Sequence, residues 1–558
     1  MKLTAALLAS ILLAAACTAD QSNGTEHASQ KEPSPQHERS EVEAPQDLAT
    51  VTCWQAEPSD GSSDISFSDI TPTAGLLEPL AGMFAHAAAW GDINGDLFPD
   101  LVVGTFADRP KPDYEHRGAT EAAPDRLLVQ SDGAFVVHGG FPATFGRTSG
   151  AAFADLDNDG DLDLVLARNV KSDQDLGSTT VYENVDGSFV VVESGIDGAF
   201  GGRSIGILDY DGDGLQDLFI AEDRYRGGHS RLFRNLGGLR FADVTADAGF
   251  PDMLAGLGIA TADVDGDNDV DLFIAGDNRL FLDVGTRFEE GTAGTFRWPP
   301  VGDEDDPAGA AFGDVNLDGR MDLVIGQHFN STVDFGVPAP VRLFLNRTEP
   351  GGEVAFDEIT DAAGLIPLPT KAPHVEIVDI DNDGWPDIVT SASSAGGTRP
   401  AVFRGLGIED GLPRFQAPEG LGDAQYWVAA PAADADLDGR LDLLLVEFDP
   451  SMPSYLMKNE TASGNWLEVS VGEEDGGGIG GHVFVYDAGA PSSAPDRLVG
   501  SVAITASRGY SAGVPAIAHI GLGDVARVDV VVRLPGGRVV SKSGVPANRH
   551  IRLPGGCR

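Results

Sequence analysis

Aspartates recur at fixed spacing in seven short segments of this chain, in the pattern D-x-(D/N)-x-D-G-x-x-D. In the third segment Asp209, Asp211 and Asp213 stand at positions 1, 3 and 5, and Asp217 stands at position 9. Alternate carboxylates on a tight loop can converge on one point, and Gly214 at position 6 permits the left-handed backbone that brings the last carboxylate round. Hard oxygen ligands in this arrangement suit Ca²⁺. The segments, loop 1 to loop 7 in chain order, are therefore predicted calcium loops.

Positions 1, 3, 5 and 9 of every loop supply the predicted metal ligands. They are Asp92, Asn94, Asp96 and Asp100 in loop 1; Asp155, Asp157, Asp159 and Asp163 in loop 2; Asp209, Asp211, Asp213 and Asp217 in loop 3; Asp263, Asp265, Asp267 and Asp271 in loop 4; Asp314, Asn316, Asp318 and Asp322 in loop 5; Asp379, Asp381, Asp383 and Asp387 in loop 6; and Asp434, Asp436, Asp438 and Asp442 in loop 7. Up to seven Ca²⁺ ions are expected, as structural staples rather than sensors or catalysts. The alternative is a set of acidic turns that bind nothing specific.

Two loops lack the glycine at position 6, where Leu97 and Asn268 replace it. Asparagine tolerates the left-handed region and leucine does not, so Gly95 is expected to carry the turn in loop 1. An EF-hand is excluded, because it needs a glutamate at position 12. That position holds apolar residues or threonine here, such as Val103, Ile220 and Thr390. Each loop should therefore lead into a β-strand.

A second repeated element lies between the loops and must position them. It reads R-L-F-x-N, then a turn, then F-x-D-(I/V)-T, as in Arg231–Asn235 followed by Phe241–Thr245. Short apolar or alternating runs separated by Gly, Asn and Asp predict β-strands. Regular repetition predicts supersecondary units that share their cores. The fold class expected is all-β, with a seven-bladed β-propeller over residues 61–460.

The loops resemble the FG-GAP and VCBS repeats of integrin α-subunit propellers and of many secreted bacterial proteins. Residues 461–558 resemble the ASPIC/UnbV domain through five short motifs, among them Ile479–Val483, Arg508–Ser511 and His519–Gly523. The combination is typical of the cartilage acidic protein family. The resemblance implies an extracellular, calcium-binding interaction protein. The alternating pattern of Trp466–Val471 independently predicts a small β-sandwich-like domain in this region.

The N-terminus sets the expected compartment. Residues 1–17 read as a secretory signal that ends in a lipobox-like Cys17, although plain cleavage before Cys17 fits as well. Residues 18–60 are polar and predicted to be a disordered tether. Lipidation of Cys17 would leave Cys53 and Cys557 as an even pair, for which a disulfide and two free thiols are both open. The protein is expected to be exported, and to touch the membrane only through this lipid anchor.

The acidic composition limits the classes of partner that the protein can bind. The formal net charge is −50, which argues against nucleic-acid binding even after seven Ca²⁺ ions are added. We expect a monomeric interaction module for an extracellular protein or glycan. The insertions 105–125 and 327–340 and the loop 297–309 are candidate binding segments, with Tyr114, His116, Arg117 and Trp298 as contacts.

The alternative is a carbohydrate-active enzyme, of lyase or hydrolase type, on a propeller scaffold. Candidate bases for such an enzyme are His86, His116, His328 and His374. Nothing pairs these histidines in sequence, so no catalytic residue is predicted.

Overall fold

The computed structural model describes residues 46–47, 51–58, 61–62, 64–119, 121–131, 133–142, 144–169, 178–196, 201–291, 294–298, 307–328, 341–349, 351–393, 399–420, 425–489 and 497–554. Strands dominate these residues, which confirms the expected all-β class. The short helices are α1 (Lys111–His116) and α2 (Thr360–Ala363). Neither is long or apolar enough to span a membrane, and the rest of the described chain adds no helix that is.

Seven antiparallel sheets follow one another along the described chain, and in six of them the strands pair in sequence order. The first three sheets are β4 (Ala85–Gly91), β5 (Asp100–Thr105), β6 (Arg126–Ser131) and β7 (Ala134–Val137); β8 (Thr148–Ala154), β9 (Asp163–Arg168), β10 (Thr180–Val185) and β11 (Ser188–Val191); and β12 (Gly202–Leu208), β13 (Asp217–Glu222), β14 (Arg231–Asn235) and β15 (Phe241–Asp243).

The next three are β16 (Gly256–Ala262), β17 (Asp271–Gly276), β18 (Arg279–Asp283) and β19 (Phe288–Gly291); β20 (Pro307–Gly313), β21 (Asp322–Gln327), β22 (Arg342–Asn346) and β23 (Phe356–Glu358); and β24 (Val375–Val378), β25 (Asp387–Ser393), β26 (Pro400–Glu409) and β27 (Leu412–Gln416), with β28 (Gln425–Tyr426) on β25.

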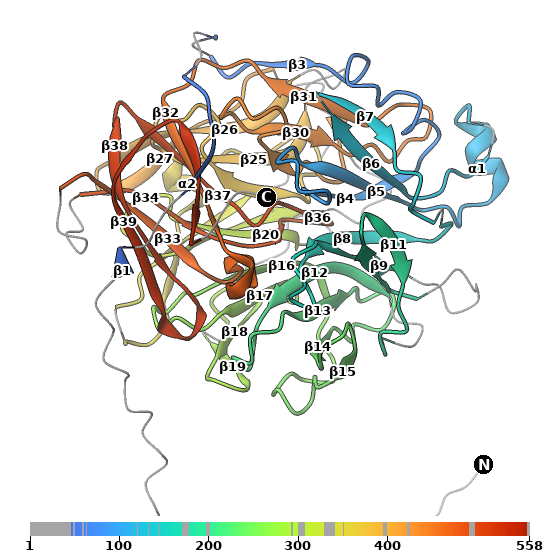
Figure 1. Ribbon diagram of the computed structural model, residues 1–558, viewed down its shortest axis with the longest axis horizontal. Helices are drawn as coiled ribbons and strands as arrows, with labels where there is room; N and C mark the ends of the chain where they lie inside the picture. Colours follow the sequence, from blue (N-terminus) through green and yellow to red (C-terminus); the bar gives the residue numbers. More distant parts are fainter. Residues whose placement is uncertain are drawn as a thin grey trace, which may run out of the picture. The chain divides into compact units, whose positions relative to one another are not determined.

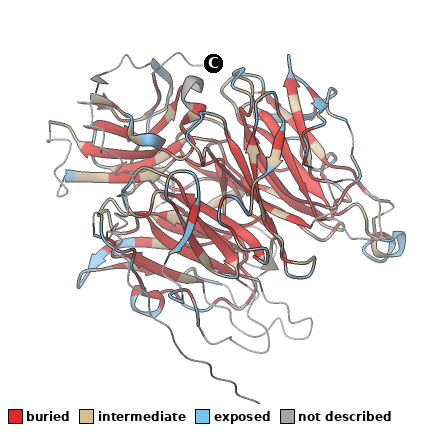
Figure 2. Cartoon of the chain, turned by 90° about the horizontal axis from the view of Figure 1, so that it is seen from below, coloured by how far each residue is buried: buried red, intermediate tan, exposed pale blue. Residues whose placement is uncertain are grey.

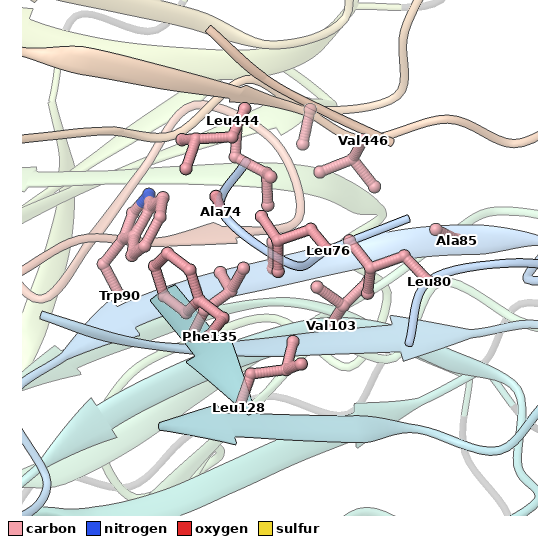
Figure 3. Packing of buried hydrophobic residues seen from close by; sticks show 14 of the residues in the cluster. Ala74, Leu76, Leu80, Ala85, Trp90, Val103, Leu128, Phe135, Leu444 and Val446 are labelled. Carbon is pink, nitrogen blue, oxygen red and sulfur yellow. The ribbon is translucent and has the colours of Figure 1, made fainter. Parts of the chain in front are cut away.

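The seventh sheet joins the two ends of the repeated region. It contains β29 (Ala432–Ala433), β30 (Asp442–Leu445) and β31 (Tyr455–Asn459), and its outer strand is β3 (Phe67–Asp69) from the start of the chain. Leu444 of this sheet and Val446, which follows β30, pack with Trp90 and Val103 of the first sheet in one apolar core (Figure 3). The first and last repeats are therefore in direct contact.

The first strands of successive sheets lie next to one another, toward the middle of Figure 1. Small residues make this approach possible, as in the Ala- and Gly-rich β4, β16 and β20. The first and second strands are buried along almost their whole length, whereas exposure increases in the outer strands (Figure 2). Burial on both faces explains the continuous apolar runs that follow each loop.

Two further sheets form the C-terminal part. One contains β2 (Val51–Gln55), β40 (Arg549–Leu553), β32 (Asn465–Val471) and β37 (Ala518–Gly523). The other contains β1 (Gln46–Asp47), β39 (Val539–Pro546), β38 (Arg527–Arg533), β33 (His482–Asp487) and β34 (Leu498–Ala503). Apolar residues of both sheets share one core, including Val469, Val485, Ile520 and Val530. Two 3₁₀ turns, Glu473–Gly478 and Pro535–Gly537, complete this part.

β2 corrects one expectation. It falls in the segment 18–60 that composition predicts to be a disordered tether, yet it pairs with β40. Trp54 packs on His550 with ring centroids 4.0 Å apart. The average composition of 18–60 concealed a run of five residues with enough apolar area to complete a sheet edge. Cys53 of β2 is disulfide-bonded. Cys17 and Cys557 lie outside the described residues, so the Cys53–Cys557 pairing and the lipidation of Cys17 stay predictions.

A loop of the C-terminal part runs between the first strands of the repeats. This Tyr510 loop (residues 507–513) carries β35 (Ser507–Arg508) and β36 (Ala512–Gly513), and β36 pairs in parallel with β4. The Gly509 N–H donates to the Ala310 carbonyl at 3.0 Å. A Cβ on Gly258 would lie 2.1 Å from the Ala308 carbonyl oxygen and 2.7 Å from that of Gly509. Only glycine fits where β16, β20 and this loop meet.

The substitution Gly258→Ala tests this packing. The new methyl group would meet backbone atoms that cannot move alone, so we expect a loss of about 1–3 kcal/mol in the free energy of unfolding. Gly139→Ala is the matched control, since a Cβ there meets nothing within 4 Å. Urea unfolding of both variants in calcium measures the difference. Equal midpoints for the two variants would contradict the close approach.

Candidate metal centre

Each predicted calcium loop connects the first strand of a sheet to its second strand. The aspartate at position 9 begins the second strand, as Asp100 begins β5 and Asp217 begins β13. This confirms that the loops lead into β-strands rather than helices. The sites therefore lie at the same end of all seven first strands.

The carboxylate at position 1 shapes the loop backbone. In loop 3, Asp209 Oδ1 accepts the Asp213 N–H at 3.1 Å, and its Oδ2 accepts the Gly214 N–H at 2.8 Å. The same two bonds form in the other six loops, on Asp92, Asp155, Asp263, Asp314, Asp379 and Asp434. The first aspartate thus serves as a loop-forming residue in addition to a predicted ligand.

Two residues in every loop are left-handed, at positions 4 and 6. In loop 1 they are Gly95 and Leu97, with φ of 73° and 80°. The prediction that Gly95 would carry the turn, so that Leu97 would not need a left-handed backbone, is therefore wrong. The sequence did not predict the left-handed backbone at position 4, because this position holds Asn, Gly or Leu, as in Asn158, Gly212 and Leu437. The hydrogen bonds to position 1 are what hold these strained residues.

The carboxylate at position 9 ties the loop to the sheet. Asp217 Oδ2 accepts the Tyr210 N–H at 3.0 Å, and its Oδ1 accepts the Asn235 N–H of the third strand at 2.7 Å. The Asn235 side chain then donates to the Leu156 carbonyl of loop 2 at 2.7 Å. Asn184, Asn346 and Asn459 reach the loop of the preceding repeat in the same way. The asparagine of the R-L-F-x-N element therefore links neighbouring loops.

The structure brings acidic ligand atoms together in five loops. Within each group the oxygens lie within 4.8 Å of one another, and the groups are Asp155, Asp157 and Asp163; Asp209, Asp211 and Asp217; Asp263, Asp265 and Asp271; Asp379, Asp381 and Asp387; and Asp434, Asp436 and Asp438. Four groups use positions 1, 3 and 9, and the loop 7 group uses positions 1, 3 and 5. Loops 1 and 5 carry the amide oxygens of Asn94 and Asn316 at position 3.

The electrostatics of the clusters favour a cation. Burial raises the pKa of Asp163 and of Asp217 to about 8, and that of Asp100 to about 7. Backbone N–H donors oppose this rise, whereas neighbouring loop carboxylates add to it. A group of hard oxygens with uncompensated negative charge fits a hard divalent cation, and Ca²⁺ accepts such irregular oxygen sets. The residues can therefore hold metal ions.

Basic side chains distinguish the loops from one another. Arg234 of β14 lies 2.7 Å from Asp211 and 3.0 Å from Asp213. Arg404 contacts Asp381 and Asp383 of loop 6, and Lys458 contacts Asp436 and Asp438 of loop 7. The equivalent residues in the other repeats are Val129, Glu183, Leu282 and Leu345. The sequence places these basic residues at position x of the R-L-F-x-N element. Only the fold shows that the side chain at this position faces the loop.

The C-terminal sheets contact the loops directly. The Gly464 N–H donates to the Asp381 carbonyl at 3.0 Å, and His519 Nε2 lies 2.8 Å from Asn382 Oδ1. His519 and His550 both bond Glu468, at 3.1 and 3.3 Å. Burial alone would raise the pKa of Glu468, but these hydrogen bonds outweigh it and lower the pKa to about 2. Three strands contribute to this cluster, so sequence spacing could not reveal it.

A cavity of about 680 Å³ separates part of the loop surface from the C-terminal sheets. Asp92, Asp155 and Asp434 of loops 1, 2 and 7 line this cavity, together with Glu468 and His550 of the C-terminal sheets. Three predicted metal centres therefore adjoin one cavity.

The structure gives the predicted binding residues of the insertions different contacts. Tyr114 is buried, and its hydroxyl donates to the Phe106 carbonyl at 3.1 Å, so it is a packing residue. Arg117 pairs with Asp449, and Trp298 lies under Arg342. His116 ends α1.

The other candidate bases come together. His86, His328 and His374 all contact Tyr510 of the C-terminal part, which no local pattern could have shown.

Comparison with known proteins agrees with the repeat pattern. The FG-GAP-like repeat matches residues 155–220, 209–274, 263–325 and 379–445, and the ASPIC and UnbV family matches residues 473–556. Cartilage acidic protein 1 of Mus musculus is 28% identical over 439 residues, which cover 71% of this chain and 63% of the relative. The Homo sapiens protein is 27% identical over 440 residues, covering 71% and 61%. The chain thus spans less than two thirds of the length of these relatives.

Among solved structures, the Vibrio cholerae biofilm matrix protein Bap1 matches with a TM-score of 0.31 and 14% identity, over 90% of this chain and 64% of its own. The extracellular domain of a putative hybrid two-component system from B. thetaiotaomicron matches with a TM-score of 0.39 and 9% identity, over 71% of this chain and 39% of its own.

The raised pKa values predict an inverted pH dependence for the metal-free protein. An unfolded aspartate titrates near ~3.9, and Asp163 and Asp217 titrate at about 8 when folded. The folded state binds more protons across this window, so the free energy of unfolding should fall as the pH rises toward 8. Urea midpoints of metal-depleted protein measure this, and Asp217→Asn should reduce the slope. A midpoint that rises with pH would contradict the assignment.

Proposed function

We propose that this chain, which joins FG-GAP-like repeats to an ASPIC and UnbV domain and is homologous to cartilage acidic protein 1, is an exported, calcium-binding interaction protein. Its scaffold would be a closed seven-bladed β-propeller. The seven consecutive sheets, the pairing of β3 with β31 and the shared core of the first and seventh sheets support this closure.

The convergence of carboxylates in the loops carries the proposal. Each loop folds its backbone around the first aspartate and gathers buried oxygens that burial makes reluctant to ionise. Positions 1, 3, 5 and 9 would hold the ion, which supplies positive charge to the cluster. Several clusters of buried carboxylates without a bound cation would be costly for a protein whose total stability is of the order of ~5–15 kcal/mol. Calcium is therefore proposed as a requirement of the fold.

The role as an interaction module rests on the scaffold and its chemistry. Binding functions concentrate on the loops that a rigid scaffold displays. The predicted signal segment and Cys17 would place the module outside the cell, free or anchored by lipid. An extracellular protein or glycan is the proposed partner.

A carbohydrate-active enzyme is the second candidate. The observation that favours it is the convergence of His86, His328 and His374 on Tyr510, which gives the candidate bases a common location. Release of shortened or unsaturated sugars from a polysaccharide would identify the enzyme. Depletion of the protein by an intact polysaccharide, without product, would identify the interaction module.

Calcium should raise the melting temperature strongly. A site held at ~100 times its Kd adds about 2.7 kcal/mol to the free energy of unfolding, and several sites act together. We expect several equivalents of bound calcium by elemental analysis and a large fall in melting temperature in excess chelator. No bound metal and an unchanged melting temperature would contradict calcium as a staple.

Single loops can be tested separately. Asp381→Ala and Asp211→Ala each remove the position 3 ligand, so each should bind fewer calcium ions and melt at a lower temperature. The effect should be larger for Asp381, because loop 6 also contacts Gly464 of the C-terminal part. Asp247→Ala, at an exposed turn, is the control. If both loop variants melt at the same temperature as the control in calcium, calcium in these loops does not stabilise the fold.

A further inference from the structure

Three of the seven predicted metal loops have a basic side chain beside them. The position equivalent to x of the R-L-F-x-N element holds Arg234 beside loop 3, Arg404 beside loop 6 and Lys458 beside loop 7. It holds Glu183 in the repeat of loop 2 and Leu282 in that of loop 4. These five loops each carry four aspartates, so they have the same ligand charge and differ at this position. Loops 1 and 5, which have an asparagine at position 3, are not matched to them in charge.

The basic side chain in loop 3 lies against two of the predicted ligands. Arg234 Nε is 2.7 Å from Asp211 Oδ2, and Nη2 is 3.0 Å from Asp213 Oδ2. Asp211 Oδ1 is buried and has no hydrogen-bond partner. An ion held by this oxygen would share the Asp211 carboxylate with Arg234, and their positive charges would repel each other. Arg404 approaches loop 6 in the same way, with Nη2 2.5 Å from Asp381 Oδ2.

Loop 7 receives two cations. Lys458 Nζ contacts Asp436 and lies 3.0 Å from Asp438 Oδ2, and Arg440 also pairs with Asp438. Burial alone would raise the pKa of Asp438, but Arg440 and Lys458 outweigh burial and lower it. Asp436 Oδ1 and Asp442 Oδ2 are nevertheless buried without a hydrogen-bond partner. Loop 7 therefore keeps oxygens for an ion, but with part of their negative charge already compensated.

Loops 2 and 4 differ from these three. Within the described residues, no ion pair joins a basic side chain to their ligand aspartates. Burial raises the pKa of Asp157 in loop 2, and the negative charges of Asp159 and Glu183 add to the rise. In loop 4 burial raises the pKa of Asp265 to about 7, and the other carboxylates of the cluster add to it. These two loops present their whole ligand charge to a cation.

We propose that the residue at position x sets the calcium affinity of the loop beside it, so that loops 2 and 4 bind Ca²⁺ more tightly than loops 3, 6 and 7. Ligand charge is one of the factors that tune calcium affinity, and a fixed cation beside the ligands reduces the charge that the ion meets. Loops 3, 6 and 7 then release calcium first as its concentration falls. The inference rests on the proposed calcium function and adds a graded response to it.

One loop of the weaker class also contacts the C-terminal sheets. The Gly464 N–H donates to the Asp381 carbonyl at 3.0 Å, and the Gly523 N–H donates to the Asn382 carbonyl at 2.9 Å. His519 Nε2 lies 2.8 Å from Asn382 Oδ1. A fall in calcium therefore reaches this contact while loops 2 and 4 are still loaded.

Stepwise removal of calcium from the loaded full chain tests the assignment. Dialysis against buffers of decreasing free calcium, followed by elemental analysis, counts the ions that the chain retains. We expect loops 3, 6 and 7 to lose their ions before a plateau at which loops 2 and 4 keep theirs. Arg234→Gln should shift the release of one ion about tenfold or more toward lower free calcium. Glu183→Arg should shift one ion in the opposite direction.

Arg231→Gln is the matched control. Arg231 begins the same strand as Arg234, but it pairs with Asp243 rather than with a metal loop, so its removal should leave the release curve unchanged. Melting temperatures in saturating calcium show whether each variant folds. Hydrogen exchange of the parent chain at the plateau needs no variant. Relative to saturating calcium, residues 379–387 should lose protection and residues 155–163 should keep it.

Release of all ions in one step would overturn the inference. So would a folded Arg234→Gln variant that releases calcium like the parent, or one that releases it at higher free calcium, because the arginine would then position the ligands instead of weakening the site. Equal loss of protection in the two loops would contradict it as well. Each of these outcomes leaves calcium binding itself standing. A chain that binds no calcium at all would remove the proposed function together with this inference.

Discussion

The burial of closely spaced carboxylates is the constraint on which the rest of this structure depends. Every repeat places an aspartate cluster where the first strand turns into the second, and burial alone shifts those groups toward their neutral form. Backbone N–H groups of the protein compensate part of this cost by donating hydrogen bonds to the carboxylates. N–H groups of the loop bond the carboxylate at position 1, and N–H groups of the sheet bond that at position 9. A bound cation can neutralise the carboxylates that these donors leave uncompensated.

The same loops connect the repeats to one another. In four repeats the third-strand asparagine donates to a loop carbonyl of the repeat before it, so these hydrogen bonds join neighbouring loops. Arg234, Arg404 and Lys458 place a cation beside three of the loops, and loop 6 also receives His519 and Gly464 from the C-terminal sheets. The loops are therefore unequal in their surroundings although their sequences are nearly the same.

The two ends of the first strands have different chemistry. One end holds the acidic loops and the cavity shared with Glu468, and the other holds Arg203, His86 and their partners. The Tyr510 loop spans the distance between them and pairs with β4 on its way. Small residues in the first strands make room for it, as the contacts around Gly258 show. The Tyr510 loop thus connects the C-terminal part to both ends of the first strands.

The sequence by itself determined the seven loops, their continuation into β-strands, the repeated sheets and the separate C-terminal β region. These features depend on local spacing, because residues within ten positions decide where a carboxylate lies on a turn and which face of a strand is apolar. The tertiary structure alone decided the rest. Leu97 adopts a left-handed backbone because hydrogen bonds to Asp92 outweigh its intrinsic preference, and Tyr114 is buried because Phe84 lies against it. Tyr510 meets His86 across more than four hundred residues, a contact that only the packing of separate sheets can create.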